Sequence, residues 1–118
     1  DLVKGGLSLS GVYDLEAMRL SYHQAVLGLD ADEVAAWSPV RALPQDAGPL
    51  LAAVGGEETN EFRLQQDEFL SAWRAAGLRA RAVDLAGRHH FDVVETLADP
   101  GHPLHQALTG LIETGGLD

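Results

Sequence analysis

The stretch PLLAAVGGEETNEF, residues 49–62, decides the fold that the sequence predicts. It opens with the apolar run of residues 50–54, which has Pro49 on one side and two glycines on the other. A run of this length between chain-breaking residues is typical of a buried strand in a parallel sheet. A helix is expected next, ending at Gly77, because apolar residues recur on one face. These residues are Phe62, Phe69, Leu70 and Trp73.

Three glutamates, Glu57, Glu58 and Glu61, lie in the turn between that strand and that helix. In open α/β sheets, ligands bind at the carboxyl ends of the strands, so these carboxylates are candidate functional groups. The alternative is a solvated first helical turn, where negative charge is favourable against the helix dipole. A histidine after the next predicted strand favours the functional interpretation, since an acid at one strand end can orient that histidine.

The histidine turn, Arg88-His89-His90-Phe91, follows a predicted strand at residues 78–85. That strand, LRARAVDL, alternates apolar and charged residues, which indicates one solvent-exposed face near a sheet edge. Because Phe91 is large and apolar, we expect it to anchor the turn in the core. His90 is then the better candidate base, with His89 pointing elsewhere.

The other segments complete an alternation of strands and helices. We expect a strand at 2–10, a helical piece from 14 that stops at Gly28, and a helix at 31–37 with a capping box of Asp30 and Glu33. A loop is expected at 40–48 and a helical segment at 91–98. A last helix is expected from Pro103, with Leu104, Leu108, Leu111 and Ile112 on one side. This order predicts the α/β class, with about three parallel strands joined by crossover helices. Such a narrow sheet is incomplete on its own, because its edges would be unpaired.

The composition excludes several classes of function. The 118 residues, enough for one domain or part of one, include 8 basic and 18 acidic residues, a net charge of −10, and no cysteine. This charge disfavours nucleic acids and anionic membrane surfaces as partners. No apolar run approaches the ~20 residues of a membrane helix. Disulfides and cysteine-based zinc sites are excluded, and a cytoplasmic location is the default expectation.

Neither a metal nor a cofactor is expected from the sequence. His102 and His105 are spaced i, i+3, but no third ligand lies nearby by spacing. The segment Val54-Gly55-Gly56 lacks the G-x-G-x-x-G spacing and the basic partner of a phosphate-binding loop.

Four segments resemble a known family: SLSGVYDL, WSPV, VGGEETNEFRLQQDEF and GRHHFDVVETLADP. They are similar to the C-terminal half of the kynurenine formamidase-like (arylformamidase) esterases of the α/β-hydrolase superfamily. The resemblance covers nearly all of the sequence. It implies that residues 1–118 are the C-terminal portion of a single α/β-hydrolase domain.

Two motifs carry this resemblance to specific residues. The family's acid turn has the form G-x-x-D-S/T-x-E-F-x-x-Q, and its histidine stands in an H-F pair. The sequence matches with Gly55, Glu58, Thr59, Glu61, Phe62, Gln65 and the pair His90-Phe91, with glutamate at position 58 where aspartate is usual. The resemblance implies hydrolysis of carboxylic esters or aryl formamides without a cofactor, with His90 as the base and Glu58 as the acid that orients it.

The family's nucleophile elbow, G-x-S-x-G, and its H-G-G-x-W oxyanion loop are absent from this sequence; in the family both lie upstream. Ser8, within GLSLS, imitates the elbow and precedes Glu58 and His90 in the correct order, but Ser10 replaces the second glycine. The preferred interpretation is structural: the strand ends at Ser10.

Further along, Tyr13, Asp14 and Glu57 are possible residues at the mouth of the site, with a structural cap as the alternative role for Asp14. The partners implied are a small ester or amide substrate, and either a missing N-terminal half or a second copy that covers the open sheet edge. The rival hypothesis is a non-catalytic, truncated hydrolase-like module that self-associates through that edge.

Overall fold

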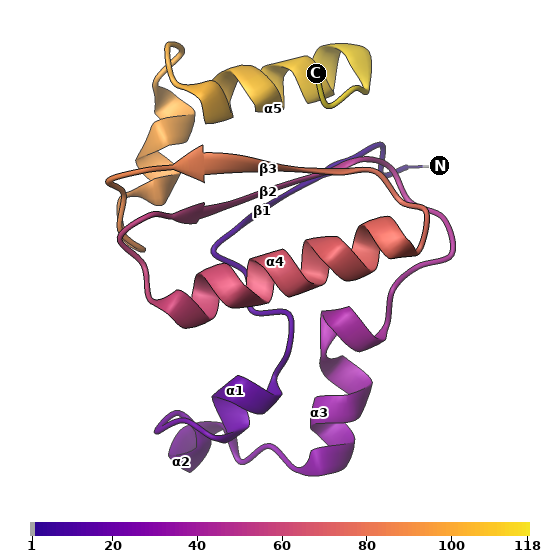
Figure 1. The fold of residues 1–118 in the computed structure, drawn as a ribbon, viewed down its shortest axis with the longest axis vertical. Helices are drawn as coiled ribbons and strands as arrows, with labels where there is room; N and C mark the ends of the chain where they lie inside the picture. Colours follow the sequence, from indigo (N-terminus) through magenta and orange to yellow (C-terminus); the bar gives the residue numbers. More distant parts are fainter. Residues whose placement is uncertain (1) are drawn as a thin grey trace.

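The computed structural model describes residues 2–118 and contains a three-stranded parallel sheet with the order β1-β2-β3 (Figure 1). The strands are β1 (Gly6–Leu9), β2 (Leu50–Gly55) and β3 (Ala80–Leu85). Leu9 pairs with Ala53, and Gly55 pairs with Leu85, so all three carboxyl ends meet at one edge. The α/β class with parallel strands is therefore confirmed.

Helices cover both faces of the sheet. The α-helices are α1 (Glu16–Arg19), α2 (Gln24–Leu27), α3 (Ala31–Trp37), α4 (Asn60–Ala75) and α5 (Pro103–Thr114), and two 3-10 helices are η1 (Pro39–Arg41) and η2 (Val93–Ala98). Figure 1 shows α4 on one face and α5 on the other, with α1, α2 and α3 in a further layer beyond α4. Among residues 2–118, no helix combines the length and apolar character needed to cross a membrane.

The α4 face of the sheet is packed with aromatic side chains. Phe69, Leu70 and Trp73 are buried there, as their spacing predicts. The ring of Tyr13 stacks on Phe69 with centroids 4.1 Å apart. Phe62, which we expected on the same face, is only half-buried and lies at the start of α4.

The α5 face forms the second core. Leu104, Ala107 and Leu111 pack against residues of β2 and β3. Ile112, expected on the same side, is 75% exposed, so that prediction is wrong. One residue advances a helix by about 100°, so the neighbour of the buried Leu111 points away from the sheet.

Several element boundaries differ from the prediction. The first strand covers residues 6–9 rather than 2–10, and the helical piece from residue 14 splits into α1 and α2. The split occurs at Ser21, whose hydroxyl donates to the carbonyl of Met18 and accepts from the N–H of His23. Serine hydroxyls that bond nearby backbone groups compete with the helix in this way. The capping box of Asp30 and Glu33 at α3 is confirmed.

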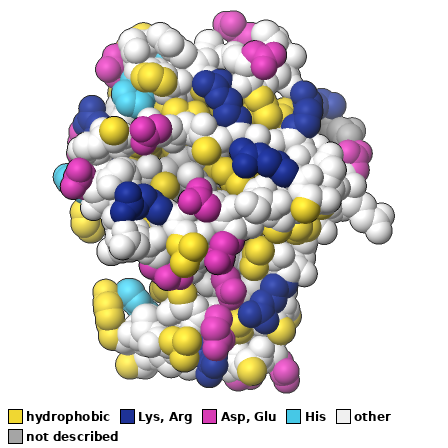
Figure 2. All heavy atoms as spheres, viewed as in Figure 1, with side chains coloured by type: hydrophobic (Ala, Val, Ile, Leu, Met, Phe, Trp, Pro, Cys, Tyr) yellow, Lys and Arg dark blue, Asp and Glu magenta, His cyan; other side chains and the backbone are white. Residues whose placement is uncertain are grey.

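The side of the molecule shown in Figure 2, viewed as in Figure 1, mixes both signs of charge with apolar side chains. At the sheet edges the two outer strands differ. Strand β3 carries Arg81 and Asp84 at exposed positions, whereas β1 has the sequence GLSL and no charged residue. Charged residues on an edge strand oppose the addition of a further strand, so β1 is the less protected edge.

Candidate functional site

The carboxylate of Glu58 lies just beyond the carboxyl end of β2, and its side chain has no exposed surface. Each of its oxygens has a defined partner. Oε1 is 2.7 Å from Nδ1 of His90. Oε2 accepts hydrogen bonds from the Ser10 hydroxyl at 2.5 Å and from the Gly55 N–H at 2.6 Å. Three strands therefore supply partners to one buried carboxylate.

These contacts determine the charge of Glu58. Burial raises the pKa of the carboxyl, but the hydrogen bonds from Ser10, Gly55 and His90 outweigh it and hold the pKa below its ordinary value. Hydrogen bonds donated to a carboxylate favour its ionised form. Glu58 is therefore an anion at neutral pH, as an orienting acid must be.

The backbone of the histidine turn is held against the acid turn. The N–H of Glu57 donates to the carbonyl of Arg88 at 3.0 Å, and the N–H of Arg88 donates to the carbonyl of Leu85 at 3.1 Å. These bonds bring His90 over Glu58, while the His90 side chain stays 49% exposed. When Nδ1 donates its proton to Glu58, the lone pair of Nε2 is free to accept a proton from a substrate or nucleophile.

Phe91 does not anchor this turn, contrary to our expectation. Its side chain is 84% exposed, and Val93, at 4% exposure, is the residue of the turn that enters the core. The core position lies two residues later than we expected, because the N–H groups of Asp92 and Val93 both donate to the carbonyl of His89, and the resulting turn brings Val93 against the core. His89 points away from Glu58, as expected, with Nε2 3.5 Å from Asp92.

Two adjoining hollows lie beside the acid–histidine pair. A shallow one of about 200 Å³ is lined by Glu57, Glu58, Thr59, Phe62, His89, His90 and Phe91. A second one, of about 380 Å³, shares Thr59 and Phe62 with the first. Its other walls come from Glu61 and Gln65 of α4, from Val12, and from side chains between residues 17 and 23 that include Met18 and Tyr22. Space therefore exists next to His90 for a small molecule.

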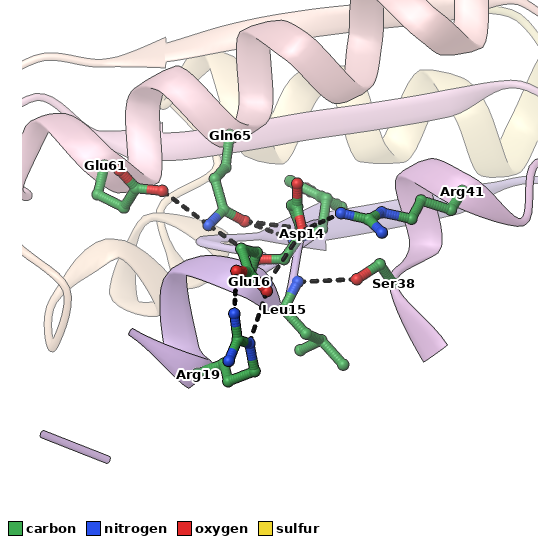
Figure 3. Close-up of polar contacts among 9 residues, drawn as sticks. Asp14, Leu15, Glu16, Arg19, Ser38, Arg41, Glu61 and Gln65 are labelled. Carbon is green, nitrogen blue, oxygen red and sulfur yellow. Dashed lines mark hydrogen bonds and ion pairs between the residues drawn. The ribbon is translucent and has the colours of Figure 1, made fainter. Parts of the chain in front are cut away.

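Tyr13 and Asp14 are not among the residues that line these two hollows. Tyr13 is buried, and its hydroxyl lies 2.7 Å from the Ser8 hydroxyl. Burial raises the pKa of Tyr13, and the hydrogen bond with Ser8 offsets only part of that increase. Asp14 accepts from the N–H of Glu16 at the start of α1 and lies 3.6 Å from Arg41 (Figure 3). These contacts give Asp14 a structural role just before α1, as in the alternative that we considered, although the N-cap position itself is Leu15.

Gln65, one of the motif residues, connects α4 to the segment after β1. Its Oε1 accepts from the N–H groups of Tyr13 and Asp14, and its Nε2 donates to the carbonyl of Asp14 and to Glu61 (Figure 3). Because these backbone groups are largely removed from water, Gln65 supplies partners they would otherwise lack.

The two candidate serines are placed differently. Ser8 lies within β1, paired with Ala52, and its hydroxyl contacts Tyr13 rather than the acid–histidine pair. Ser10, which we considered only as a departure from an elbow motif, contacts Glu58 directly. The sequence signal that could have found it is a hydroxyl residue directly after a strand, at the edge where Glu58 and His90 also lie.

His102 and His105 have structural partners. His102 Nδ1 accepts from the N–H of Leu104 as the cap of α5, and His105 Nδ1 lies 2.7 Å from the carbonyl of Leu97. Within the part of the chain that the structure describes, no three His, Cys, Asp or Glu side chains are grouped to hold a metal ion.

Comparison with known proteins adds to this geometry. The sequence matches no family model. The kynurenine formamidase of Danio rerio is 30% identical over 115 residues, which are 93% of this chain and 39% of that protein. The chain resembles the kynurenine formamidases. The kynurenine formamidase of Salmo salar is 28% identical over 112 residues, with 90% of this chain and 38% of that protein covered.

The chain thus spans less than two fifths of the length of the formamidases that it matches. A crystal structure described as a "putative thioesterase" from Silicibacter sp. TM1040 has the same fold over the matched region. The TM-score is 0.76 at 30% identity, covering 88% of this chain and 38% of that one. The predicted resemblance to the formamidase-like esterases is confirmed, and so is the predicted α/β fold with an open, three-stranded parallel sheet that matches part of a hydrolase-like structure.

Proposed function

We propose that this chain supplies the acid and the base of a serine–histidine–acid hydrolase acting on carboxylic esters or aryl formamides. Glu58 is the acid and His90 is the base. The serine nucleophile and the oxyanion-binding N–H groups belong to a part of the enzyme outside residues 1–118. The observation that carries the proposal is the 2.7 Å contact between Glu58 Oε1 and His90 Nδ1 at the ends of two adjacent parallel strands.

The chemistry follows from the orientation of the imidazole. Glu58 accepts the Nδ1 proton, which fixes the tautomer whose Nε2 lone pair can take the proton of a serine hydroxyl. The serine oxygen then attacks the carbonyl carbon of the substrate, and His90 returns the proton to the leaving alcohol or amine. Water repeats the sequence to release the acid. The buried carboxylate stabilises the imidazolium that exists between the two proton transfers.

The substrate class rests on the named relatives and on the space beside His90. Two relatives are named for a formamide-cleaving activity, and the solved structure for thioester cleavage. Formamide, ester and thioester cleavage each pass through a tetrahedral intermediate of the same type, and one acid–base pair can serve all three. The adjoining hollow, with Met18, Tyr22 and Phe62 in its walls, suits an apolar group on the substrate.

The test is labelling with a serine-directed fluorophosphonate, read by intact mass and peptide mapping, on the longest natural form of the protein. We expect one label on a serine outside residues 1–118. His90→Gln should slow labelling at least ~100-fold, the usual contribution of a general base. The matched control is His89→Gln, because His89 is adjacent, exposed and directed at Asp92. Equal labelling rates for both variants would refute the role of His90, and a label on Ser8 would refute the placement of the nucleophile.

A second candidate function, supported by the unprotected β1 edge, is a non-catalytic module that self-associates. Strand β1 pairs with β2 on one side only within residues 2–118, and it carries no charge to oppose a further strand. In the hydrolase proposal this edge is covered by the N-terminal half, and in the second candidate by another copy of the chain.

Size-exclusion chromatography with light scattering separates the two candidates. Self-association through β1 predicts a dimer whose share rises with protein concentration. A monomer of 12.6 kDa at all concentrations would eliminate the self-associating module.

A further inference from the structure

Ser10 connects strand β1 to the acid–histidine pair. Its hydroxyl donates to Glu58 Oε2 at 2.5 Å, while its own N–H donates to the carbonyl of Ala53 at 2.8 Å. The backbone bond fixes Ser10 beside the end of β2. The side-chain bond then links the end of β1 to the buried carboxylate, whereas Glu58 follows β2 and His90 follows β3.

The backbone at Ser10 is unusual. Its φ is +48°, and it is the one non-glycine residue with a positive φ between residues 2 and 118. For an L-residue this left-handed conformation is strained, because Cβ comes close to the following carbonyl oxygen, and glycine avoids that strain. A glycine here would therefore suit the backbone better than serine. The serine side chain offsets this strain through one contact that glycine lacks, the hydrogen bond from its hydroxyl to Glu58.

We propose that Ser10 is a positioning residue that fixes which oxygen of Glu58 faces His90; this inference rests on the proposed function. The glutamate side chain has several rotatable bonds, so its carboxylate is free to turn unless both of its oxygens are held. Ser10 and Gly55 together occupy Oε2 and leave Oε1 for Nδ1 of His90. With Gly55 alone, the carboxylate retains one fixed bond and can rotate about it.

The inference is tested by NMR on three variants of the same chain. Ser10→Ala and Ser10→Gly both remove the hydroxyl, but only glycine also relieves the backbone strain. Ser8→Ala is the matched control, because it removes a hydroxyl two residues earlier that bonds Tyr13 instead of Glu58. The readouts are the ¹³C shift of the Glu58 carboxyl against pH and the rate at which the His90 Nδ1 proton exchanges with solvent.

We expect the Glu58 carboxyl to titrate at higher pH in both Ser10 variants, and the Nδ1 proton to exchange about tenfold faster or more. That factor follows from the strength of a hydrogen bond to a charged group. Ser8→Ala should leave both readouts unchanged. A role of Ser10 limited to the backbone predicts the opposite: Ser10→Gly would match the unmodified chain in both readouts, and that result would overturn the inference.

Glu58→Gln distinguishes failure of this inference from failure of the proposed function. If Glu58→Gln leaves the Nδ1 proton of His90 unchanged, the acid–histidine pair itself is refuted. If Glu58→Gln alters that proton but the two Ser10 variants do not alter the Glu58 titration, only the role of Ser10 is refuted.

Discussion

Replacing Gly55 by alanine tests how the two functional turns are held together. Gly55 ends strand β2, and a Cβ atom placed on it would lie 2.3 Å from the carbonyl oxygen of Arg88 and 3.0 Å from Cγ1 of Val93. An ordinary C···O contact needs about 3.3 Å, so the histidine turn would have to move by about 1 Å. That turn carries His90 and accepts the bond from the N–H of Glu57.

The magnitude follows from two contributions. Overpacking of this kind costs about 1–3 kcal/mol, and loss of the bond between Glu57 and Arg88 adds about 1 kcal/mol. We therefore expect Gly55→Ala to lower the free energy of unfolding by about 2–4 kcal/mol in urea titrations followed by circular dichroism. The same 1 Å displacement should weaken the contact of His90 with Glu58, seen as faster exchange of its Nδ1 proton.

The matched control is Gly6→Ala in the neighbouring strand. A Cβ on Gly6 would lie 3.5 Å from Cδ1 of Leu50, which is ordinary van der Waals contact. Its free energy of unfolding should stay within about 1 kcal/mol of the unmodified chain or rise slightly, because alanine restricts the unfolded state. If Gly55→Ala is as stable as Gly6→Ala, then close approach at Gly55 does not hold the two turns together.

Four further substitutions test the acid, the core, with one exposed control position, and a helix cap. Because the pKa of Glu58 in the folded chain lies below its ordinary value, its ionised form stabilises the fold at pH values above that ordinary pKa, and this stabilisation is lost as the pH falls through the lower, folded-state pKa. Glu58→Gln should therefore flatten the dependence of unfolding free energy on pH in that acid range; an unchanged slope would contradict the bonding of Glu58. Leu104→Ala should cost about 2–5 kcal/mol in urea unfolding because Leu104 is fully buried, whereas Ile112→Ala should stay within about 0.5 kcal/mol. Asp30→Ala removes the cap of α3 and should cost about 0.5–2 kcal/mol, with faster amide exchange confined to that helix; protection equal to the unmodified chain would count against the cap.

The sequence was sufficient to predict the order of strands and helices around the site. Residues 50–54 are continuously apolar, whereas residues 78–85 alternate apolar and charged side chains, and a glycine follows closely after each segment. These patterns placed β2 and β3 to within two residues. The expectation that Glu58 and His90 lie together followed from parallel pairing, which brings the carboxyl ends of adjacent strands to one edge. That expectation agrees with the observed contact.

Side-chain directions within turns were not predictable in the same way. In a regular helix or strand, sequence spacing fixes the direction of each side chain, but in a turn the backbone dihedral angles decide it. Phe91 was therefore placed in the core although it is exposed, and Val93 takes that position instead. Within α5, Ile112 was misplaced for a simpler reason: two adjacent apolar residues at the margin of an apolar face cannot both point to the core.

Ser10 shows a third limit. Its contact with Glu58 joins residues 48 positions apart, and it requires a left-handed backbone at a serine. Intrinsic preference would assign that conformation to the following Gly11 instead. Only the paired register of β1 and β2 reveals that the hydroxyl and the carboxylate lie at the same level of the sheet.

Strands β2 and β3 follow one another in the chain and are also direct neighbours in the sheet, joined by the single helix α4. The acid and the histidine therefore belong to one β-α-β unit, and the peptide segment that sets their separation runs only from residue 50 to residue 93. Apart from Ser10, no described residue outside this segment bonds to Glu58 or His90, so changes in other loops should leave the geometry of the pair unaltered. Under the proposed function, a designer seeking new substrate selectivity would vary the wall of the second hollow between Val12 and His23 and leave Ser10 and the β-α-β unit unchanged.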